Sequence, residues 1–429
     1  MRGGVLSVVG FSLATVIAAA CSSGSSRDSF APNGKSFATD PGSSSSGDAK
    51  NPNLGASGDP NGGGAQSCGD ASYAAKQTPA AMLFVLDKSG TMASQSKYAN
   101  AQVAIVTAMD NDAFDNMELG LLGYPTSNVA GPECIFGLPV LCGVSAVPQV
   151  QLQPAGNMKS VMGGVRKDIY NWLATNAPQP GNGDANPTYD ALKNGIDALQ
   201  RSSVVGKRIL VYITDGGASC ASASTRPGYE DGNGCRDWEY PDSIVQLLKT
   251  AHADMTKPVN TMVVGVPGAD THGDNQNVPP YSVRLALSAY AAVGSPESID
   301  PTCDGQAFSQ SNSDPAKSCH FDMTRGNYTA QALADAINSI RGKLLGCSFD
   351  LPSTGSPIDR SKVNVKVTAG GKTQDLYRRK DASSKCEADG CWDYNADGRV
   401  DLIGPACDKV KSSTSAKVEI QVGCTTVIR

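Results

Sequence analysis

Five oxygen-bearing side chains in three separate segments have the types and spacing of a metal site. The first three stand at alternate positions of Asp87-Lys88-Ser89-Gly90-Thr91, the fourth ends Asn186-Pro187-Thr188, and the fifth is the middle residue of Thr214-Asp215-Gly216. Hydroxyl, carboxylate and water oxygens are the ligands that Mg²⁺ takes in proteins. We therefore predict a Mg²⁺ or Mn²⁺ site formed by Asp87, Ser89, Thr91, Thr188 and Asp215.

The residues that precede two of these segments indicate where the site lies. Met82–Leu86 and Arg208–Ile213 are almost continuous apolar runs. Such runs fit strands that are buried on both faces. In an open α/β sheet, ligands bind beyond the carboxyl ends of the strands. We therefore expect the five side chains to meet at one edge of a sheet.

The pattern resembles the metal-ion-dependent adhesion site (MIDAS) of von Willebrand factor A (VWA) and integrin I-type domains, which reads Asp-x-Ser-x-Ser, then a distant Thr and a distant Asp. Thr91 replaces the second serine and keeps its hydroxyl. The resemblance extends over about residues 80–346. It implies that Ser89 and Thr91 ligate Mg²⁺ directly, as Thr188 does in one of two conformations. Asp87 and Asp215 would act largely through bound water.

The chemistry of such a site also implies a kind of partner. Hydroxyls and water leave the ion short of negative charge, and in this family the ion accepts a carboxylate from a partner protein. The resemblance thus implies a protein ligand with an exposed acidic residue. It leaves open whether Thr188 and Asp215 exchange as direct ligands when a partner binds.

A second candidate ion site lies in the segment Asp393-Tyr394-Asn395-Ala396-Asp397-Gly398-Arg399-Val400-Asp401. It matches the opening of a calcium-binding loop, with oxygen donors at alternate positions and a glycine for the turn. The twelfth position is Gly404, where an EF-hand has its bidentate glutamate. One interpretation is a polar hairpin turn beside Trp392. The other is a weak Ca²⁺ site formed by Asp393, Asn395, Asp397, Arg399 and Asp401.

The elements that must position these residues follow from the hydrophobic periodicity. Buried strands are predicted at 82–86, 119–122, 208–213 and 261–266. A short antiparallel strand is predicted at 150–152, and a short strand, of no stated direction, near Phe321. Helical spacing covers 96–109, 158–173, 189–199, 243–252, 283–292 and 329–345. Alternating buried strands and amphipathic helices indicate a doubly wound, Rossmann-like α/β domain with a mostly parallel central sheet.

After Cys347 the period of the apolar residues changes. Apolar and polar residues alternate at 363–367 and again at 418–422, and we expect no helix between them. This pattern predicts a small, disulfide-braced antiparallel β unit. The expected domains are therefore a VWA domain at 68–346 and a Cys-rich, β-rich extension at 347–429.

Residues 1–20 have the features of a bacterial lipoprotein signal peptide. Arg2, an interrupted apolar stretch and three alanines precede Cys21, which we expect to be lipidated. Residues 21–67 are then the lipidated end and a linker made almost entirely of Ser, Gly, Asp, Asn and Pro, a composition that predicts disorder. An ordinary cleaved signal, with Cys21 incidental, is the alternative.

The whole layout resembles a family of bacterial lipoproteins with a lipid cysteine, a low-complexity linker, a VWA domain and a Cys-rich tail that starts with Cys-x-Phe and ends with Gly-Cys-Thr. Cys347-Ser348-Phe349 and Gly423-Cys424-Thr425 match these landmarks. The resemblance implies a protein at the outer membrane or cell surface of a Gram-negative bacterium, attached to the membrane by its lipid anchor only. It leaves open whether the domain faces the periplasm or the outside.

The cysteines agree with export from the cytoplasm. Of 13 cysteines, setting Cys21 aside leaves 12, an even number. A zinc site is disfavoured, since the sequence has no CxxC pair and only three histidines. The partners of Cys68, Cys386, Cys391 and Cys407 stay open. The candidate disulfides are three pairs close in sequence and the two landmark cysteines of the extension: Cys134–Cys142, Cys220–Cys235, Cys303–Cys319 and Cys347–Cys424.

Charge and motifs narrow the classes of function. The net charge of -5, without a basic cluster, argues against nucleic-acid binding. The sequence has no HExxH or GxSxG motif, so we do not expect an enzyme. The leading prediction is a surface-tethered adhesion module that captures a protein partner through its ion. The alternatives are an envelope scaffold component and a secreted hydrolase with an accessory VWA domain.

Overall fold

The computed structural model describes residues 71–77, 79–126, 143–178, 186–219, 239–272, 279–309, 311–326, 328–344, 347–354, 357–412 and 416–429. The signal peptide 1–20, Cys21 with the linker 21–67, Cys68, and the candidate disulfides Cys134–Cys142 and Cys220–Cys235 lie outside these residues. Among the described residues, no helix combines the length and the apolar character needed to cross a membrane.

A six-stranded sheet of order β5-β4-β3-β6-β7-β8 forms the centre of the α/β domain. Its strands are β3 (Ala80–Asp87), β4 (Met117–Tyr124), β5 (Val150–Pro154), β6 (Arg208–Thr214), β7 (Val259–Gly265) and β8 (Phe321–Asp322). All neighbouring strands are parallel except β4 and β5. Every residue of β3, β6 and β7 is buried, as continuous apolar runs predict for strands covered on both faces.

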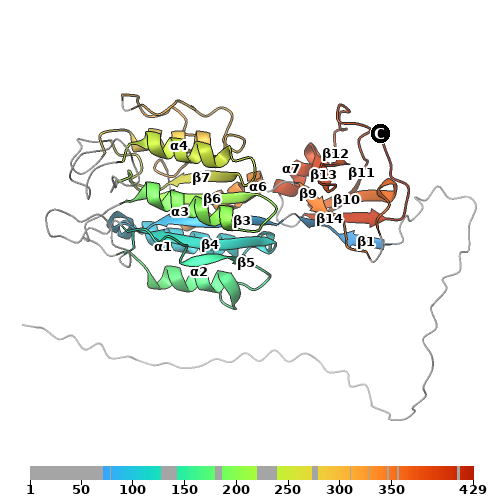
Figure 1. The fold of residues 1–429 in the computed structure, drawn as a ribbon, viewed down its shortest axis with the longest axis horizontal. Helices are drawn as coiled ribbons and strands as arrows, with labels where there is room; N and C mark the ends of the chain where they lie inside the picture. The colour runs from blue at the N-terminus through green and yellow to red at the C-terminus, as the bar shows by residue number, and fades with distance from the viewer. Residues whose placement is uncertain are drawn as a thin grey trace, which may run out of the picture. The chain divides into compact units, whose positions relative to one another are not determined.

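Helices cover both faces of this sheet (Figure 1). One face carries α1 (Lys97–Met109), α2 (Gly164–Thr175) and α6 (Ala330–Leu344), and the other carries α3 (Thr188–Arg201), α4 (Pro241–His252) and α5 (Val283–Gly294). Successive side chains of a strand point to opposite faces, so Phe84 joins one buried apolar cluster and Leu83 the other. The predicted doubly wound α/β fold is confirmed, although α2 begins at Gly164 and not at residue 158.

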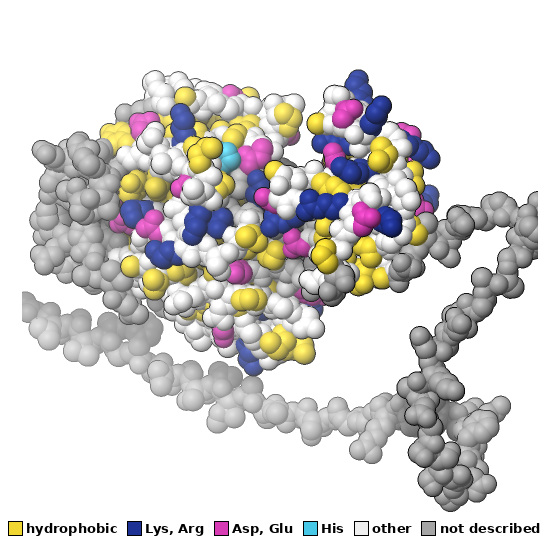
Figure 2. All heavy atoms as spheres, turned by 45° about the vertical axis from the view of Figure 1, so that its right-hand side comes forward, with side chains coloured by type: hydrophobic (Ala, Val, Ile, Leu, Met, Phe, Trp, Pro, Cys, Tyr) yellow, Lys and Arg dark blue, Asp and Glu magenta, His cyan; other side chains and the backbone are white. Residues whose placement is uncertain are grey.

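Some apolar side chains remain exposed on the surface of the protein. On the face shown in Figure 2, they are scattered in small groups among polar and charged side chains. Scattered exposed apolar residues are usual on a folded surface.

The order of the strands reverses at β3, which lies between β4 and β6. Such a reversal leaves a crevice beyond the carboxyl ends of the strands, where α/β proteins bind their ligands. Leu86 of β3 is in register with Ile213 of β6. The segments that follow these two residues therefore reach the same edge of the sheet, side by side.

The C-terminal part forms two four-stranded antiparallel sheets, of order β1-β14-β10-β11 and β12-β13-β9-β2. Val363 and Val365 are fully buried against Trp392, so the period-two pattern is confirmed as a β unit. The strands are β1 (Ala71–Ala74), β2 (Lys76–Gln77), β9 (Ser348–Asp350), β10 (Val363–Ala369), β11 (Lys372–Leu376), β12 (Cys391–Tyr394), β13 (Val400–Ile403) and β14 (Lys417–Val422).

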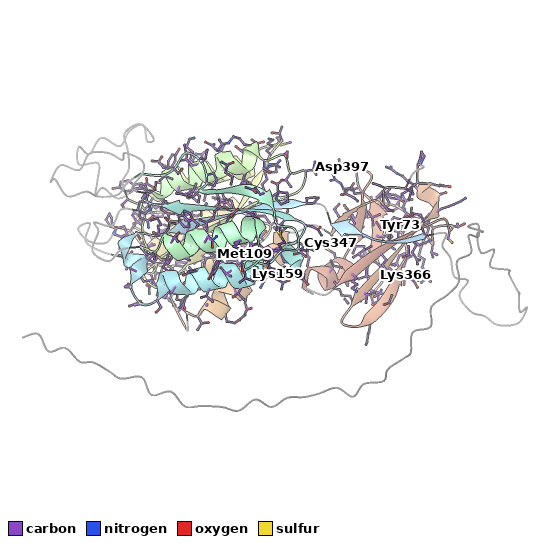
Figure 3. All side chains as sticks on the ribbon, turned by 90° about the horizontal axis from the view of Figure 1, so that it is seen from below. Tyr73, Met109, Lys159, Cys347, Lys366 and Asp397 are labelled. Atoms are coloured by element: carbon purple, nitrogen blue, oxygen red, sulfur yellow. A yellow bond between two sulfur atoms is a disulfide. The ribbon has the colours of Figure 1, made fainter. Side chains whose placement is uncertain are left out.

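Two expectations for this part were wrong. Strands β1 and β2 precede the α/β domain in the sequence, yet β1 pairs with β14 and β2 pairs with β9. Tyr73 of β1, labelled in Figure 3, lies opposite Ile420. The α/β domain therefore begins at Ala80 and not at residue 68. The chain between β13 and β14 also contains a helix, α7 (Pro405–Ser412), where we expected none.

Disulfides join three pairs of described cysteines. The pair Cys303–Cys319 is confirmed. Cys347 bonds Cys407, so the candidate Cys347–Cys424 is wrong, and Cys386 bonds Cys391. The backbone explains the Cys347–Cys407 bond. The backbone N–H of Leu402 in β13 donates to the carbonyl of Cys347, and α7, which contains Cys407, directly follows β13. Disulfides of this kind indicate an extracytoplasmic protein.

Candidate metal centre

Asp87 lies at the centre of the candidate site, as the last residue of β3. Its carboxylate is 0% exposed. One oxygen, Oδ1, accepts from the backbone N–H of Ser89 at 2.8 Å. The other, Oδ2, accepts from the Asn186 amide and from the Thr214 hydroxyl, each at 2.7 Å. These donors are neutral, so they orient the carboxylate without balancing its charge.

The electrostatics of Asp87 fit a bound cation. Burial, followed by the nearby negative charge of Asp215, raises the pKa of Asp87 to about 7. A buried carboxylate is costly unless it is paired or bound to a metal. No described Lys, Arg or His forms an ion pair with Asp87. The residues present therefore fit a divalent ion, which would supply the missing positive charge.

Ser89, Thr91 and Asp215 lie next to one another beside this carboxylate. The hydroxyls of Ser89 and Thr91 are 3.1 Å apart. Thr91 donates to Asp215 Oδ1 at 3.0 Å, although the two residues are far apart in the sequence. The short 3₁₀ helix Gly90–Ala93, which begins shortly after the end of β3, places the Thr91 hydroxyl there. The structure thus brings four of the five predicted ligands into one group.

Thr188, the fifth predicted ligand, is connected to this group through Asn186. Its hydroxyl donates to Asn186 Oδ1 at 2.7 Å and lies 2.9 Å from the hydroxyl of Tyr212. The same Asn186 donates its amide to Asp87. Thr188 is fully buried as the first residue of α3, so it lies close behind the site with its hydroxyl hydrogen-bonded to Asn186 and Tyr212.

Three further residues of the site were missed by the sequence argument. Asn186 and Thr214 stood inside the segments we singled out, but only the fold shows that both bind the Asp87 carboxylate. Lys97 donates to Asp215 Oδ2 at 2.5 Å, and the two side chains are 7% and 1% exposed. The sequence did contain one indication that Lys97 has an acidic partner. A cation in the first turn of a helix is unfavourable next to the positive end of the helix dipole, so it needs a nearby anion.

Sites made from few acidic residues are easy to overlook. In the described part of the chain, no group of three or more His, Cys, Asp or Glu residues is placed to hold a metal ion. The candidate site has two carboxylates, Asp87 and Asp215, and depends on hydroxyls for its other oxygens. That composition suits Mg²⁺ or Mn²⁺, which bind through few protein oxygens and retain water.

In the candidate calcium loop, side-chain cations already pair with the first carboxylate. Asp393 accepts hydrogen bonds from Arg378 at 3.0 Å and from Arg379 at 2.8 Å, so two guanidinium groups already balance its charge. Asn395 Oδ1 accepts from the backbone N–H groups of Asp397 and Arg399, each at 3.0 Å. The segment forms the turn of the β12–β13 hairpin, as the first of the two interpretations describes.

Asp401 and Arg399 are also directed elsewhere. The Asp401 carboxylate accepts from the hydroxyl of Ser348 and from the Asn395 amide. The carbonyl of Arg399, which would be a ligand in a calcium loop, accepts from the backbone N–H of Asn395 at 3.0 Å. The oxygens of this segment therefore take part in hydrogen bonds that stabilise the hairpin.

Comparisons with known proteins find similarities to solved structures. No protein-family model matches the sequence, and a comparison with curated proteins finds no match. Among solved structures, the pilus adhesin SpaC from Lactobacillus rhamnosus GG is 15% identical, with a TM-score of 0.42 over 80% of this chain and 40% of SpaC. The VWA domain of SpRpn10 is 11% identical, with a TM-score of 0.32 over 61% of this chain and 95% of that domain.

A third similar structure is proximal thread matrix protein 1 from the mussel byssus with a zinc-occupied MIDAS motif. It is 13% identical, with a TM-score of 0.31 over 64% of this chain and 47% of that protein. This chain thus spans less than half the length of SpaC and of the byssus protein. The protein described here has a doubly wound α/β domain and disulfide-bonded antiparallel sheets.

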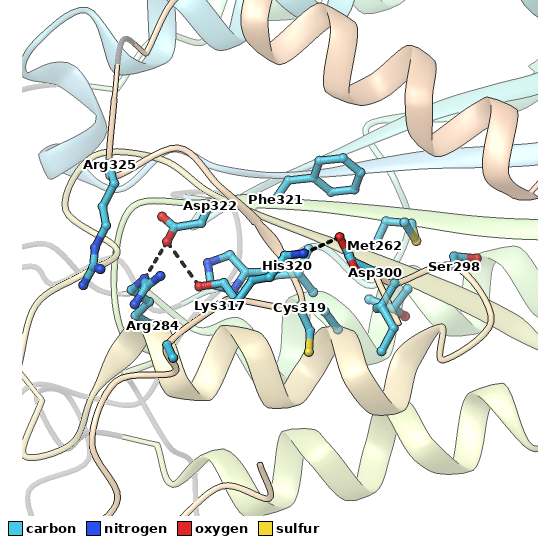
Figure 4. Close-up of a pocket in the computed structure, with 16 residues that line it drawn as sticks. Met262, Arg284, Ser298, Asp300, Lys317, Cys319, His320, Phe321, Asp322 and Arg325 are labelled. Carbon is cyan, nitrogen blue, oxygen red and sulfur yellow. Dashed lines mark hydrogen bonds and ion pairs between the residues drawn. The ribbon is translucent and has the colours of Figure 1, made fainter. Parts of the chain in front are cut away.

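A cavity of about 500 Å³ lies beside β7 and β8 (Figure 4). None of the five candidate metal ligands is among the residues that line it. Its charged side chains are already paired, Arg284 with Asp322 and Lys317 with Asp300. His320 lines it, and both ring nitrogens are buried without a hydrogen-bond partner among the described residues. Burial lowers the pKa of His320 to about 4.

This histidine predicts a pH dependence of the folding stability. Unfolding returns the pKa of His320 from about 4 to its ordinary value of 6.5. The unfolded state therefore binds the extra proton between these two values, and stability falls as the pH drops from 6.5 towards 4. At pH 5 the contribution of His320 to this loss, relative to pH 7.5, should be about 2 kcal/mol.

The measurement is urea unfolding of the wild type and of His320→Leu at the two pH values. The variant should lose about 2 kcal/mol less than the wild type on going to pH 5. His272→Leu, which changes an exposed histidine, is the control. Equal losses in the wild type and in His320→Leu would show that His320 does not titrate in this way.

Proposed function

We propose that this protein is a binding module, not an enzyme, that holds Mg²⁺ or Mn²⁺ at the edge of β3 and β6 and captures a protein partner through an acidic residue of that partner. Asp87, Ser89, Thr91 and Asp215 would hold the ion, with Thr188 directly behind them. When bound, the ion supplies a Lewis-acid position that accepts a carboxylate oxygen.

One observation carries this proposal. Asp87 is fully buried at the carboxyl end of the central strand, and neutral donors alone contact it among the described residues. Asn186 and Thr214 fix the orientation of its Oδ2 oxygen. The hydroxyls of Ser89 and Thr91 lie beside it with their oxygens 3.1 Å apart. A cation at this place would meet a carboxylate that is already oriented to receive it.

We also propose where the module acts. Lipidation at Cys21 and the linker 21–67 would hold it at the outer membrane or cell surface, so that the domain can reach partners at a distance from the membrane. The disulfides of the described chain support a place outside the cytoplasm.

The test is affinity capture from cells, with the protein immobilised in Mg²⁺ or in EDTA and with Asp87→Asn as the matched bait. The expected result is a protein retained in Mg²⁺, released by EDTA and absent from the variant. Retention that is equal in EDTA would contradict an ion-dependent partner and favour the scaffold alternative. Metal-dependent hydrolysis by the purified protein would favour the hydrolase alternative.

A further inference from the structure

An unusual turn brings Lys97 to the edge of the candidate site. Between the 3₁₀ helix Gly90–Ala93 and α1, Gln95 and Ser96 have φ values of 52° and 57°. Left-handed backbone at a residue other than glycine is unfavourable, and such strain gathers at functional sites. The turn ends at Lys97, the first residue of α1, whose long side chain is buried against Asp215.

The dipole of α1 does not favour a lysine at this place. The first turn of α1 contains no acidic residue. A positive charge there faces the positive end of the helix, where an anion would be favoured. Lys97 is therefore balanced from outside its helix, by the Asp215 carboxylate at 2.5 Å.

The surrounding chain encloses this ion pair. At Gly268, where φ is +111°, a Cβ atom would lie 2.7 Å from the carbonyl oxygen of Asp215 and 3.4 Å from Lys97 Nζ. Glycine is thus needed for the turn after β7 to pass over the pair. The hydroxyl of Tyr328 also donates to the backbone carbonyl of Lys97 at 3.0 Å, which fixes the start of α1. The ammonium is held in place and is not a mobile surface lysine.

The charges give this lysine a specific effect on the site. Among the described residues, Lys97 is the charged side chain in contact with Asp215, and neutral groups bind Asp87. The formal charges of the Asp87 and Asp215 carboxylates and the Lys97 ammonium add up to -1. A bound divalent ion changes this net charge to +1. Without Lys97, the same filled site would sum to 0.

We propose that Lys97 is an internal counter-cation of the metal site, which weakens the binding of divalent ions at Asp215 and makes the filled site prefer an anionic ligand. This inference rests on the proposed function and deepens it. An entering ion shares Asp215 with an ammonium, and the two cations repel each other at short range. The excess positive charge that results is offset when a partner supplies a carboxylate.

The test uses the full chain and Mn²⁺, measured by isothermal titration calorimetry. Lys97→Met removes the charge, Lys97→Arg keeps it, and Lys193→Met is the control for losing a lysine from an exposed ion pair. We expect Lys97→Met to bind Mn²⁺ at least about tenfold more tightly than the wild type. The two other variants should bind within about twofold of the wild type.

A second titration tests the preference for an anion, with sodium acetate as the carboxylate probe against sodium chloride at equal ionic strength. Acetate should strengthen Mn²⁺ binding by the wild type and by Lys97→Arg, but not by Lys97→Met. An equal effect of acetate on all three proteins would overturn the proposed preference.

The outcomes separate this inference from the proposed function. If the wild type binds no Mn²⁺, or Asp87→Asn binds it equally well, the metal site itself is refuted. If the wild type binds Mn²⁺ and Asp87→Asn does not, an unchanged or weaker affinity of Lys97→Met overturns the role of Lys97 alone. Circular dichroism checks the fold, and should Lys97→Met not fold, a loss of Mn²⁺ affinity in Lys97→Arg would show that the lysine serves only to shape the site.

Discussion

Replacing Asp87 with asparagine is expected to lower the affinity for Mn²⁺ and Mg²⁺ by about 100-fold or more, which is the largest effect we predict for a single side chain. Asparagine keeps the size of the side chain and one acceptor oxygen, but it removes the charge that attracts the ion. Calorimetric titration with Mn²⁺ measures the affinity directly. The rise in melting temperature on adding Mg²⁺ should disappear in the same variant.

The stability of the metal-free variant separates a binding role of Asp87 from a structural one. In the wild type, the carboxylate is buried and in contact with neutral donors. Asparagine removes the cost of burying that charge but replaces one of two acceptor oxygens with an NH₂ group. Because these two effects oppose each other, the metal-free variant and the metal-free wild type should have similar stabilities. Asp197→Asn, at an exposed ion pair on α3, is the control. A large loss of stability without any change in Mn²⁺ affinity would mean that Asp87 serves the fold alone.

The α/β core was predictable because its signals are local and its strands are buried on both faces. The run Met82–Leu86 has no polar residue, and a strand with that composition needs helices on both sides. The ligand segments were predictable for the same reason, since Asp87 and Asp215 follow two such runs. Once the strands are parallel neighbours, their carboxyl ends must share an edge.

The missed features depend on contacts that sequence spacing does not contain. Strand β2 is two residues long, too short to carry a periodicity, and its partner β9 lies at the far end of the α/β domain in the sequence. The sequence places Lys97 in the first turn of a helix, where its charge calls for an anion, but it does not show that Asp215 is that anion. Side-chain partners supplied by a distant segment become visible only in the fold.

The calcium loop shows how such a partner changes the meaning of a motif. The alternating oxygens of Asp393 to Asp401 suit either an ion or a hairpin. Arg378 and Arg379 favour the hairpin interpretation, because both guanidinium groups bind the Asp393 carboxylate. They also hold the pKa of Asp393 below its usual value, against the effect of burial. The motif alone therefore does not distinguish a calcium site from a hairpin turn.

Replacing both Cys347 and Cys407 with alanine is expected to destabilise the protein by about 4 kcal/mol, the largest stability effect among our predictions. The bond closes a loop with a sequence separation of 60 residues, and a longer loop means a larger loss of chain entropy in the unfolded state. Both cysteines also pack on the apolar cluster of the β unit. Urea unfolding, followed by tryptophan fluorescence, measures the change because Trp392 is fully buried in that cluster.

The second disulfide of the β unit is a matched control that tests the physical reason. Cys386 and Cys391 are separated by only 5 residues, so the same chain-entropy relation gives a loss of about 2 kcal/mol for their double alanine variant. Because one unit contains both bonds, differences in environment between the two variants are small. A larger loss of stability for the longer loop would show that the Cys347–Cys407 bond acts by restricting the unfolded chain. Equal losses in the two variants would instead place the stabilisation in native packing around the sulfur atoms.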